Sequence, residues 1–560
     1  MAKKKVQLSF TDQCKQHSFY IGLVAVLVIG VSMFALRGLL PNVKNNLNAK
    51  ADTSDLVAVS GPSPITPGTP SGCNVFSTDG SNNTGAENEV SMAVDPTNKD
   101  HIVGVWSQDF YAGTMVGVSR DGGVTWVKKL IPNTTVCSGS TNNNRQLSAN
   151  NWISFAPNGD LHLIVMGLGL PPFQGYSDMM ALKSSDGGLT WSEPKTLTID
   201  DTGKSGGVTT FDKPSIAVDP KDSNIVYATW DSNRSAPSSG SHALTVAISR
   251  DGGETWGAAR DIYSIPTSGW AYAGAAKFVF TPKGRVMLFW DRAQWTKKAD
   301  ALIQVGGGNA VEQVVYTYSD DKGMNWSSTT NRLDPTIAVQ LQARRDYGVK
   351  QVVADASVYN PDSCVTLKGK TSCSVFAEQP IVYDVEVDQK TGNIYMVWND
   401  ARLSNNGDFS DVMKLHDDVL LSMSSDGGVT WSAPVKINKT PANIGNGQRQ
   451  TMIPELAISD TGVLGVAYYD FRNDNDNTTW MADYWLVKCN SASEDCLTPS
   501  NWVETRLSDS SFDMTGAMWR YTYFLGDYQG LQASGNDFVS MFTVPTATDK
   551  GNIYFRRVSQ

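Results

Sequence analysis

Four short stretches of the chain place an acidic residue and an arginine directly after an apolar run that ends in an aromatic residue. They are WDSNR (230–234), FWDRAQ (289–294), VWNDAR (397–402) and YYDFRND (468–474). A guanidinium group binds a carboxylate through two parallel hydrogen bonds, so arginines gathered at one place would bind an anionic ligand. The competing interpretation is that these pairs are salt bridges between structural units, repeated with the fold.

Segments that precede other apolar runs carry a second set of residues able to move protons or bind anions. These residues are Arg145, Asp212, Arg449, Glu455, Arg520, Tyr523, Asp527 and Tyr528. A carboxyl group exchanges protons, and a tyrosine becomes a nucleophile when a base such as Glu455 lies beside it. For Tyr523 and Tyr528, packing against neighbouring strands is the competing interpretation.

A repeated motif indicates the elements that must position these residues. The pattern S-x-D-x-G-x-T-W begins at Ser119, Ser184, Ser249 and Ser424, and a degenerate copy begins at Ser319. In the clearest unit, apolar runs at 215–218, 225–230 and 244–249 predict strands A, B and C, and the motif forms the turn to strand D. Four-stranded units repeated in this way predict an all-β propeller of six or seven blades, and we favour seven.

The two faces of such a propeller have different roles, because the chain reverses after every strand. The A–B and C–D turns share one face, here called the motif face, and the B–C and D–A connections share the other, here called the loop face. Both sets of candidate residues are expected on the loop face. The last unit, 528–558, supplies only three strands. We therefore expect a segment near residues 74–77 to close a propeller spanning 74–560, after a Pro-, Gly- and Ser-rich flexible stalk at 41–73.

The motif resembles the Asp-box, or BNR repeat, of sialidases and related propellers, over residues 89–560. In that family the boxes are structural and lie away from the active site. The residue types agree, because Ser and Asp can bind the backbone of their own turn, Gly supplies a positive φ, and Trp packs on a neighbouring strand. The resemblance implies a sialidase-like glycoside hydrolase that acts on terminal acidic sugars of glycans at the cell exterior.

The family's catalytic roles can be carried over residue by residue. The resemblance implies Arg402, Arg449 and Arg520 as the arginines that hold the substrate carboxylate. It implies Tyr523 or Tyr528 as the nucleophile, Glu455 as the base that assists it, and Asp212 as the acid. The chain departs from the family in lacking an F/Y-R-I-P stretch before the first motif, where it has no arginine. A non-catalytic surface propeller that binds glycan or protein is therefore the second hypothesis.

Composition excludes several other functions. The net charge of -10 is unsuited to nucleic acid, and five histidines make a His-built zinc site or a Ser-His-Asp relay improbable. The stretch 470–479, with Asp470, Asp474 and Asp476, offers oxygen ligands of the kind that Ca²⁺ takes, but it lacks the Gly and final Glu of a calcium loop. A solvated polar loop is the favoured interpretation there, and no cofactor is expected.

The N-terminus predicts a location. Lysines 3–5 precede an apolar run at 19–40, which is about long enough to span a bilayer as a helix. We expect residues 1–18 in the cytoplasm, a single-pass anchor at 19–40 and the propeller outside, with cleavage after Ala51 and secretion as the alternative. Six cysteines follow the anchor, and their expected pairing favours an oxidising compartment, with buried free thiols as the alternative. The expected pairs are Cys73 with Cys137, Cys364 with Cys373, and Cys489 with Cys496.

Overall fold

The structure, a computed structural model, describes the chain from residue 55 to residue 559 with gaps. The described ranges are 55–75, 82–170, 175–200, 208–235, 241–266, 271–295, 310–327, 364–367, 370–373, 383–400, 402–403, 416–474, 480–519, 522–546 and 549–559. The segment predicted to span the membrane, 19–40, lies outside them. Within the described ranges, no helix has the length and apolar character needed to cross a bilayer.

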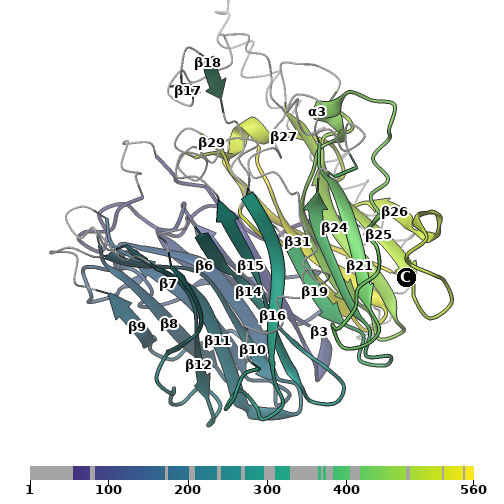
Figure 1. Ribbon diagram of the computed structural model, residues 1–560. Coiled ribbons are helices and arrows are strands. Elements are labelled where there is room, and N and C mark those ends of the chain that lie inside the picture. Colours follow the sequence, from purple (N-terminus) through teal and green to yellow (C-terminus); the bar gives the residue numbers. More distant parts are fainter. Residues whose placement is uncertain are drawn as a thin grey trace, which may run out of the picture. The chain divides into compact units, whose positions relative to one another are not determined.

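Seven antiparallel sheets follow one another along the chain, and each is one blade of a β-propeller (Figure 1). Blade I contains β2 (Asn88–Asp95), β3 (Asn98–Gln108), β4 (Gly113–Ser119) and β5 (Val127–Leu130); blade II contains β6 (Leu147–Phe155), β7 (Leu161–Leu168), β8 (Ser177–Ser184) and β9 (Lys195–Asp200). Blade III contains β10 (Val208–Asp219), β11 (Asp222–Ser235), β12 (Ser241–Ser249) and β13 (Arg260–Pro266); blade IV contains β14 (Ala271–Phe280), β15 (Val286–Trp295) and β16 (Ala310–Ser319). Blade V contains β19 (Tyr383–Val387), β20 (Ile394–Asp400), β21 (Asp418–Ser424) and β22 (Val435–Lys436); blade VI contains β23 (Thr451–Ile458), β24 (Val463–Asp470), β25 (Met481–Asn490) and β26 (Val503–Arg506). Blade VII contains β30 (Gly530–Ser534), β31 (Asp537–Val544) and β32 (Asn552–Val558), completed by β1 (Val57–Ala58).

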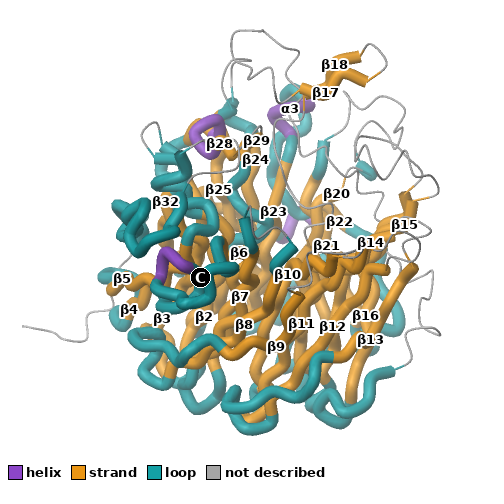
Figure 2. Tube along the Cα trace, turned by 90° about the vertical axis from the view of Figure 1, so that its left-hand side faces the viewer, coloured by secondary structure: helices purple, strands orange, loops and turns teal. Residues whose placement is uncertain are grey.

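This arrangement confirms the all-β propeller and the count of seven blades. Figure 2 shows the strands of successive blades side by side, with β6 to β9 next to β10 to β13. The remaining described elements are short. They are β27 (Phe512–Asp513), the hairpin of β28 (Met518–Trp519) and β29 (Thr522–Tyr523), the hairpin of β17 (Cys364–Leu367) and β18 (Lys370–Cys373), the helix α3 (Asn446–Arg449) and three 3₁₀ turns (Val136–Ser138, Pro499–Asn501 and Met514–Ala517).

The strand that closes the last blade differs from the expected one. Val57 and Ala58 pair with Phe555 and Tyr554 of β32, whereas the prediction placed this strand near residues 74–77. The adjacent Val59 is 1% exposed and packs between blades I and VII, so a short apolar run was enough to form the strand. Residues 55–73, which had been assigned to the flexible stalk, therefore contribute to the propeller.

Two of the expected disulfides are present. Cys73 is bonded to Cys137, which ties the segment after β1 to blade I, and Cys489 is bonded to Cys496 across the loop after β25. The third expected pair lies in the β17–β18 hairpin, where the backbone places Cys364 opposite Cys373.

The repeated motif forms the C–D turn, as predicted. In the first copy Ser119 Oγ donates to Asp121 Oδ1 (2.8 Å), the Thr125 N–H donates to the same oxygen (3.0 Å), and Trp126 Nε1 donates to the Gly123 carbonyl (2.9 Å). In the degenerate copy Asn325 replaces the threonine and donates Nδ2 to Asp321 Oδ2 (2.7 Å). Each turn is thus closed by its own side chains.

A second set of bonds joins each motif turn to the blade before it. Arg120 of blade I donates to the Asp186 carbonyl of the next turn (2.6 Å), and Lys195 of blade II donates to the Gly253 carbonyl (3.1 Å). Arg557 donates to the Gly122 carbonyl (3.2 Å), which joins blade VII to blade I. The motif is therefore scaffold that binds one blade to the next.

Candidate functional site at the centre of the loop face

The innermost strands are bulged where they leave the loop face. In blades I, II, III, IV and VI the pairing register shifts near the start of the inner strand. One residue in each bulge has a positive φ although it is not glycine; these residues are Glu89, Asn150, Lys213, Ala275 and Ile453. Bulges re-aim side chains and are frequent beside functional sites, and left-handed backbone at non-glycine residues is uncommon. The repeated distortion lies near the propeller axis.

The bulges of blades I to III bring a charged cluster together. Asn150 Nδ2 donates to Asp212 Oδ1 (2.6 Å), while the Asn150 backbone N–H donates to Glu89 Oε2 (3.1 Å). Lys213 Nζ forms an ion pair with Asp527, which precedes β30 of blade VII, and lies 3.8 Å from Asp212 Oδ1. Four blades therefore meet in one polar network, which we call the central cluster.

Exposure divides the central cluster into a buried part and one accessible group. The side chains of Lys213 and Asp527 are 8% and 6% exposed and Glu89 is 1% exposed, whereas the side chain of Asp212 is 43% exposed. Burial, opposed by the Lys213 ammonium and reinforced by Asp527, raises the pKa of Glu89 to about 8. The pKa of Lys213 is raised, because three carboxyl groups outweigh its burial.

A ring of seven residues, one from each blade, lies next to the central cluster along the axis. It consists of Ser91, Trp152, Ser215, Lys277, Asp384, Glu455 and Gln529. Lys277 Nζ lies 2.9 Å from Asp384 Oδ1 and 3.5 Å from Glu455 Oε2, and 5.1 Å from the centre of the Trp152 ring. A pocket of about 50 Å³ lies between this ring and the central cluster, lined by Lys213, Asp527 and Tyr528 among others.

Three of the residues predicted as catalytic come together here. Asp212, Glu455 and Tyr528 lie close enough for both carboxyl groups to raise the pKa of Tyr528, although burial is the largest cause and Glu89 the next. The Tyr528 hydroxyl donates to the Asn151 carbonyl (3.2 Å), and its ring packs edge-on against Trp152. These contacts agree with the packing interpretation of Tyr528. Tyr523 lies in β29, of which only the backbone is described.

The predicted substrate-binding arginines have different surroundings. Arg402 donates Nε to Asp400 Oδ2 (2.8 Å), an acid of its own blade. Arg449 ends helix α3, and its Nε is buried without a hydrogen-bond partner among the described residues. Arg520 lies outside the described residues. Arg145, from the second set, forms an ion pair with the buried Asp178 (2.7 Å).

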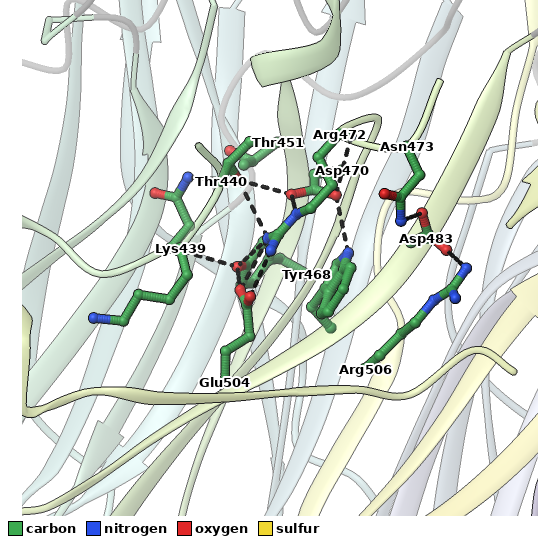
Figure 3. A network of polar contacts seen from close by, with 12 residues as sticks. Lys439, Thr440, Thr451, Tyr468, Asp470, Arg472, Asn473, Asp483, Glu504 and Arg506 are labelled. Atoms are coloured by element: carbon green, nitrogen blue, oxygen red, sulfur yellow. Dashed lines mark hydrogen bonds and ion pairs between the residues drawn. The ribbon is translucent and has the colours of Figure 1, made fainter. Parts of the chain in front are cut away.

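Arg472 gives the clearest outcome for the acid–arginine stretches (Figure 3). Its guanidinium group donates to Asp470 Oδ2 (2.6 Å) and to both oxygens of Glu504, and it lies 3.9 Å from the Trp485 ring. Arg234 binds both oxygens of Asp261 in the same way (2.6 and 2.8 Å). These pairs are salt bridges, as the competing interpretation held, but they lie within a blade rather than between blades.

The calcium suggestion is not favoured by the described part of the loop. Asp470 accepts from Arg472 through Oδ2 and from Trp485 Nε1 through Oδ1 (2.9 Å), so both of its oxygens are bound to protein donors. Asp474 is described, but Asp476 is not. Among the described residues no group of three or more His, Cys, Asp or Glu could hold a metal ion.

Sequence reasoning missed most of the basic and amide groups at the axis. Glu89, Asn150 and Lys213 occupy equivalent bulge positions, and Lys277 follows the corresponding bulge in blade IV. Their common signal is their place at, or directly after, the bulge near the start of strand A. An alignment of the inner strands to one another would have shown it, whereas a search for acid–arginine pairs selected the ends of strand B.

In comparison with known proteins, no family model and no curated protein matches the sequence. Among solved structures, a Hadza microbial sialidase is 13% identical over 73% of this chain and 66% of that chain, with a TM-score of 0.41. Penicillium chrysogenum α-L-arabinanase is 9% identical over 90% of this chain and 97% of that chain (TM-score 0.40). Trypanosoma rangeli sialidase is 12% identical over 90% of this chain and 59% of that chain (TM-score 0.37). The similarity concerns the propeller fold alone.

Proposed function

We propose that the chain is a glycoside hydrolase whose active site is the central cluster, with Asp212 as the carboxyl group that meets the substrate. The observation that carries the proposal is the exposure of Asp212, 43% for its side chain, beside Lys213 and Asp527 at 8% and 6%. Glycosidic bond cleavage needs a group that protonates the leaving oxygen and a second group that stabilises or attacks the sugar. Asp212 is suited to the proton transfer, because Asn150 and the Lys213 N–H fix its Oδ1 atom.

We assign the role of nucleophile to Tyr523 in preference to Tyr528. The Tyr528 hydroxyl is already bound to the Asn151 carbonyl, and burial among carboxyl groups raises its pKa, which opposes formation of a phenolate. Glu455 is held by Lys277 and by the Gln529 N–H (3.1 Å), and we assign it to positioning the ring of seven residues rather than to assisting a tyrosine.

A finer proposal is that the substrate is a terminal acidic sugar, as in a sialidase. Its support among the described residues is Arg449, since a buried Nε without a partner is a donor that a ligand carboxylate can use. Arg520 is the second arginine proposed for this role. Arg402 supports it less, because Asp400 already accepts from its guanidinium group.

The test is hydrolysis of fluorogenic aryl glycosides, with the α-sialoside and the α-L-arabinofuranoside as the acidic and uncharged members. We expect Asp212→Asn to lower kcat by about 10²- to 10⁴-fold on whichever glycoside is cleaved. Arg449→Ala should raise KM for the sialoside only. Hydrolysis unchanged by Asp212→Asn would contradict the site, and hydrolysis of the arabinoside alone would contradict the acidic substrate.

A non-catalytic glycan- or protein-binding propeller is the second candidate. It is favoured by the hydrogen bonds of Arg402 and Tyr528, because both side chains are already bound to groups of the protein. Binding of glycans without hydrolysis of any glycoside in the panel would select it.

We further propose that the propeller functions outside the cytoplasm, anchored by residues 19–40. The disulfides Cys73–Cys137 and Cys489–Cys496 support an oxidising compartment. N-terminal sequencing of the native protein tests the anchor, since a chain beginning near Asp52 would indicate cleavage and secretion instead.

A further inference from the structure

A second compartment lies on the other side of the ring of seven residues. It is a cavity of about 340 Å³ that extends from the ring to the A–B turns of the motif face, where Pro96, Pro157 and Pro220 line it. One water molecule takes about 30 Å³ in the liquid, so this space is about ten times larger. Its volume lies within the range of small-molecule sites, about 300 to 1,000 Å³.

The side chains that line the wall of this cavity are small and neutral in three blades, and one blade contributes an acidic side chain. Ala93, Ser154 and Ala217 each lie two residues after the ring residue of their blade and line the cavity. The equivalent residue of blade V is Glu386, two residues after Asp384. Among the described lining residues beyond the ring, Glu386 is the ionisable one.

The carboxyl groups of the ring are already committed to protein donors. Asp384 accepts from Lys277 Nζ (2.9 Å) and from the Leu456 N–H (2.8 Å). Glu455 accepts from the Gln529 N–H (3.1 Å), and Lys277 lies 3.5 Å from it. The one ammonium group among the described lining residues, that of Lys277, is therefore shared by these two acids. Burial, reinforced by Asp384 and partly offset by Lys277, raises the pKa of Glu386 to about 8.

We propose that this cavity binds a small organic cation, a primary amine, whose ammonium group pairs with Glu386. A metal ion is a poorer occupant, because a single carboxyl group beyond the ring does not make a metal site, and the described residues hold no group of three metal ligands. Ser154, Ser215 and Gln532 line the same space and can bind hydroxyl groups of the ligand. The site is separate from the proposed active site and does not depend on it.

Binding of an amine is coupled to release of a proton. At neutral pH the Glu386 carboxyl group holds its proton, and an ammonium group beside it favours the ionised form. The other ionisable groups that face it are Lys277, Asp384 and Glu455, and they remain in place in the ring. Up to one proton should therefore leave the protein when the amine binds.

The test is isothermal titration calorimetry of the full chain at pH 7 with ethanolamine, and with ethylene glycol as the uncharged probe of similar size. Titrations in two buffers that contain no primary amine and differ in ionisation enthalpy measure the proton release. We expect ethanolamine to bind with release of up to one proton, and ethylene glycol to bind at least about tenfold more weakly. Glu386→Gln should weaken ethanolamine binding by about tenfold or more and abolish the proton release.

Two further variants locate the site. Ala217→Phe fills the cavity from another blade and should abolish binding, whereas Asp212→Asn at the central cluster should leave it unchanged. If ethanolamine gives no binding at millimolar concentration, the cavity holds water only and the proposal is wrong. Binding that survives Glu386→Gln or Ala217→Phe also overturns it, provided that these variants keep the wild-type thermal unfolding transition.

Discussion

Asn150 donates its side-chain amide to Asp212 Oδ1 over 2.6 Å, although the two residues lie 62 positions apart and on different blades. The same asparagine holds Glu89 through its backbone N–H (3.1 Å). Its φ of 55° lies in the left-handed region, which asparagine tolerates better than most residues. One residue thus fixes both the accessible and the most buried carboxyl group of the central cluster.

Replacement of Asn150 tests this positioning role. We expect Asn150→Gly to lower kcat by about 10- to 100-fold on the cleaved glycoside, because Asp212 loses the amide that orients it. Glycine accepts the positive φ without strain, so the loss comes from the missing side chain. A measurement of kcat and KM separately checks it, since wild-type kcat in Asn150→Gly would contradict the positioning role.

The bulges that create this cluster could not be read from the sequence. Apolar runs predicted strand A, but a bulge inserts one residue and changes which side chain points to the axis. Asp212 was identified because a carboxyl group stands in a connection, while its neighbour Lys213 was not selected as a candidate. Lys213, the bulge residue, carries the charge that pairs with Asp527. This contact joins residues 314 positions apart, and no local pattern encodes it.

The Arg472 network predicts that two arginines of similar sequence context, Arg472 and Arg234, contribute very differently to the free energy of unfolding. Arg472 is 10% exposed and binds the fully buried Asp470, whereas Arg234 is 39% exposed and binds Asp261 at 33%. Arg472→Ala should lower the free energy of unfolding by about 3 to 5 kcal/mol, since it leaves a buried carboxylate without its partner. Arg234→Ala, the matched control, should cost about 1 kcal/mol or less. Urea denaturation measures both, and equal losses would contradict the assignment.

The motif turns predict an effect on stability alone. Asp251 accepts from Ser249 Oγ (2.8 Å), the Thr255 N–H (2.8 Å) and Thr255 Oγ1 (2.5 Å). Asp251→Ala should therefore lower the free energy of unfolding by about 1 to 3 kcal/mol without changing kcat, because three hydrogen bonds are lost far from the loop face. Asp320→Ala is the control, as Asp320 is 59% exposed and pairs with Arg285 across the surface. A fall in kcat at Asp251→Ala, measured on folded protein, would mean that the motif has a catalytic role.

The sequence predicted these turns well because the bonds that close each turn are local, between residues two to four positions apart. The closing strand was misplaced for the opposite reason. Val57 and Ala58 pair with residues near the other end of the chain, and two paired residues leave too short a pattern to recognise. Likewise the acid–arginine stretches were correctly seen as repeated, yet two of the arginines have salt-bridge partners on other strands, Asp261 for Arg234 and Glu504 for Arg472.

The buried glutamates predict that the protein loses stability as the pH rises above neutrality. Burial raises the pKa of Glu89 and of Glu455 to about 8, so in this range the folded chain holds protons that the unfolded chain releases near pH 4.5. Stability from such groups is present at low pH and is lost as the pH rises through the folded pKa. His162, whose burial lowers its pKa to about 4, has the opposite effect, but only below its unfolded value of 6.5.

Between pH 6.5 and 8 the free energy of unfolding should therefore fall, by up to about 1.4 kcal/mol per pH unit for each proton. Glu89→Gln should make the fall shallower, while Glu193→Gln, at an exposed position, should leave it unchanged. Chemical denaturation at half-unit pH steps measures the slope, and a free energy of unfolding that rises from pH 6.5 to 8 would contradict the assignment.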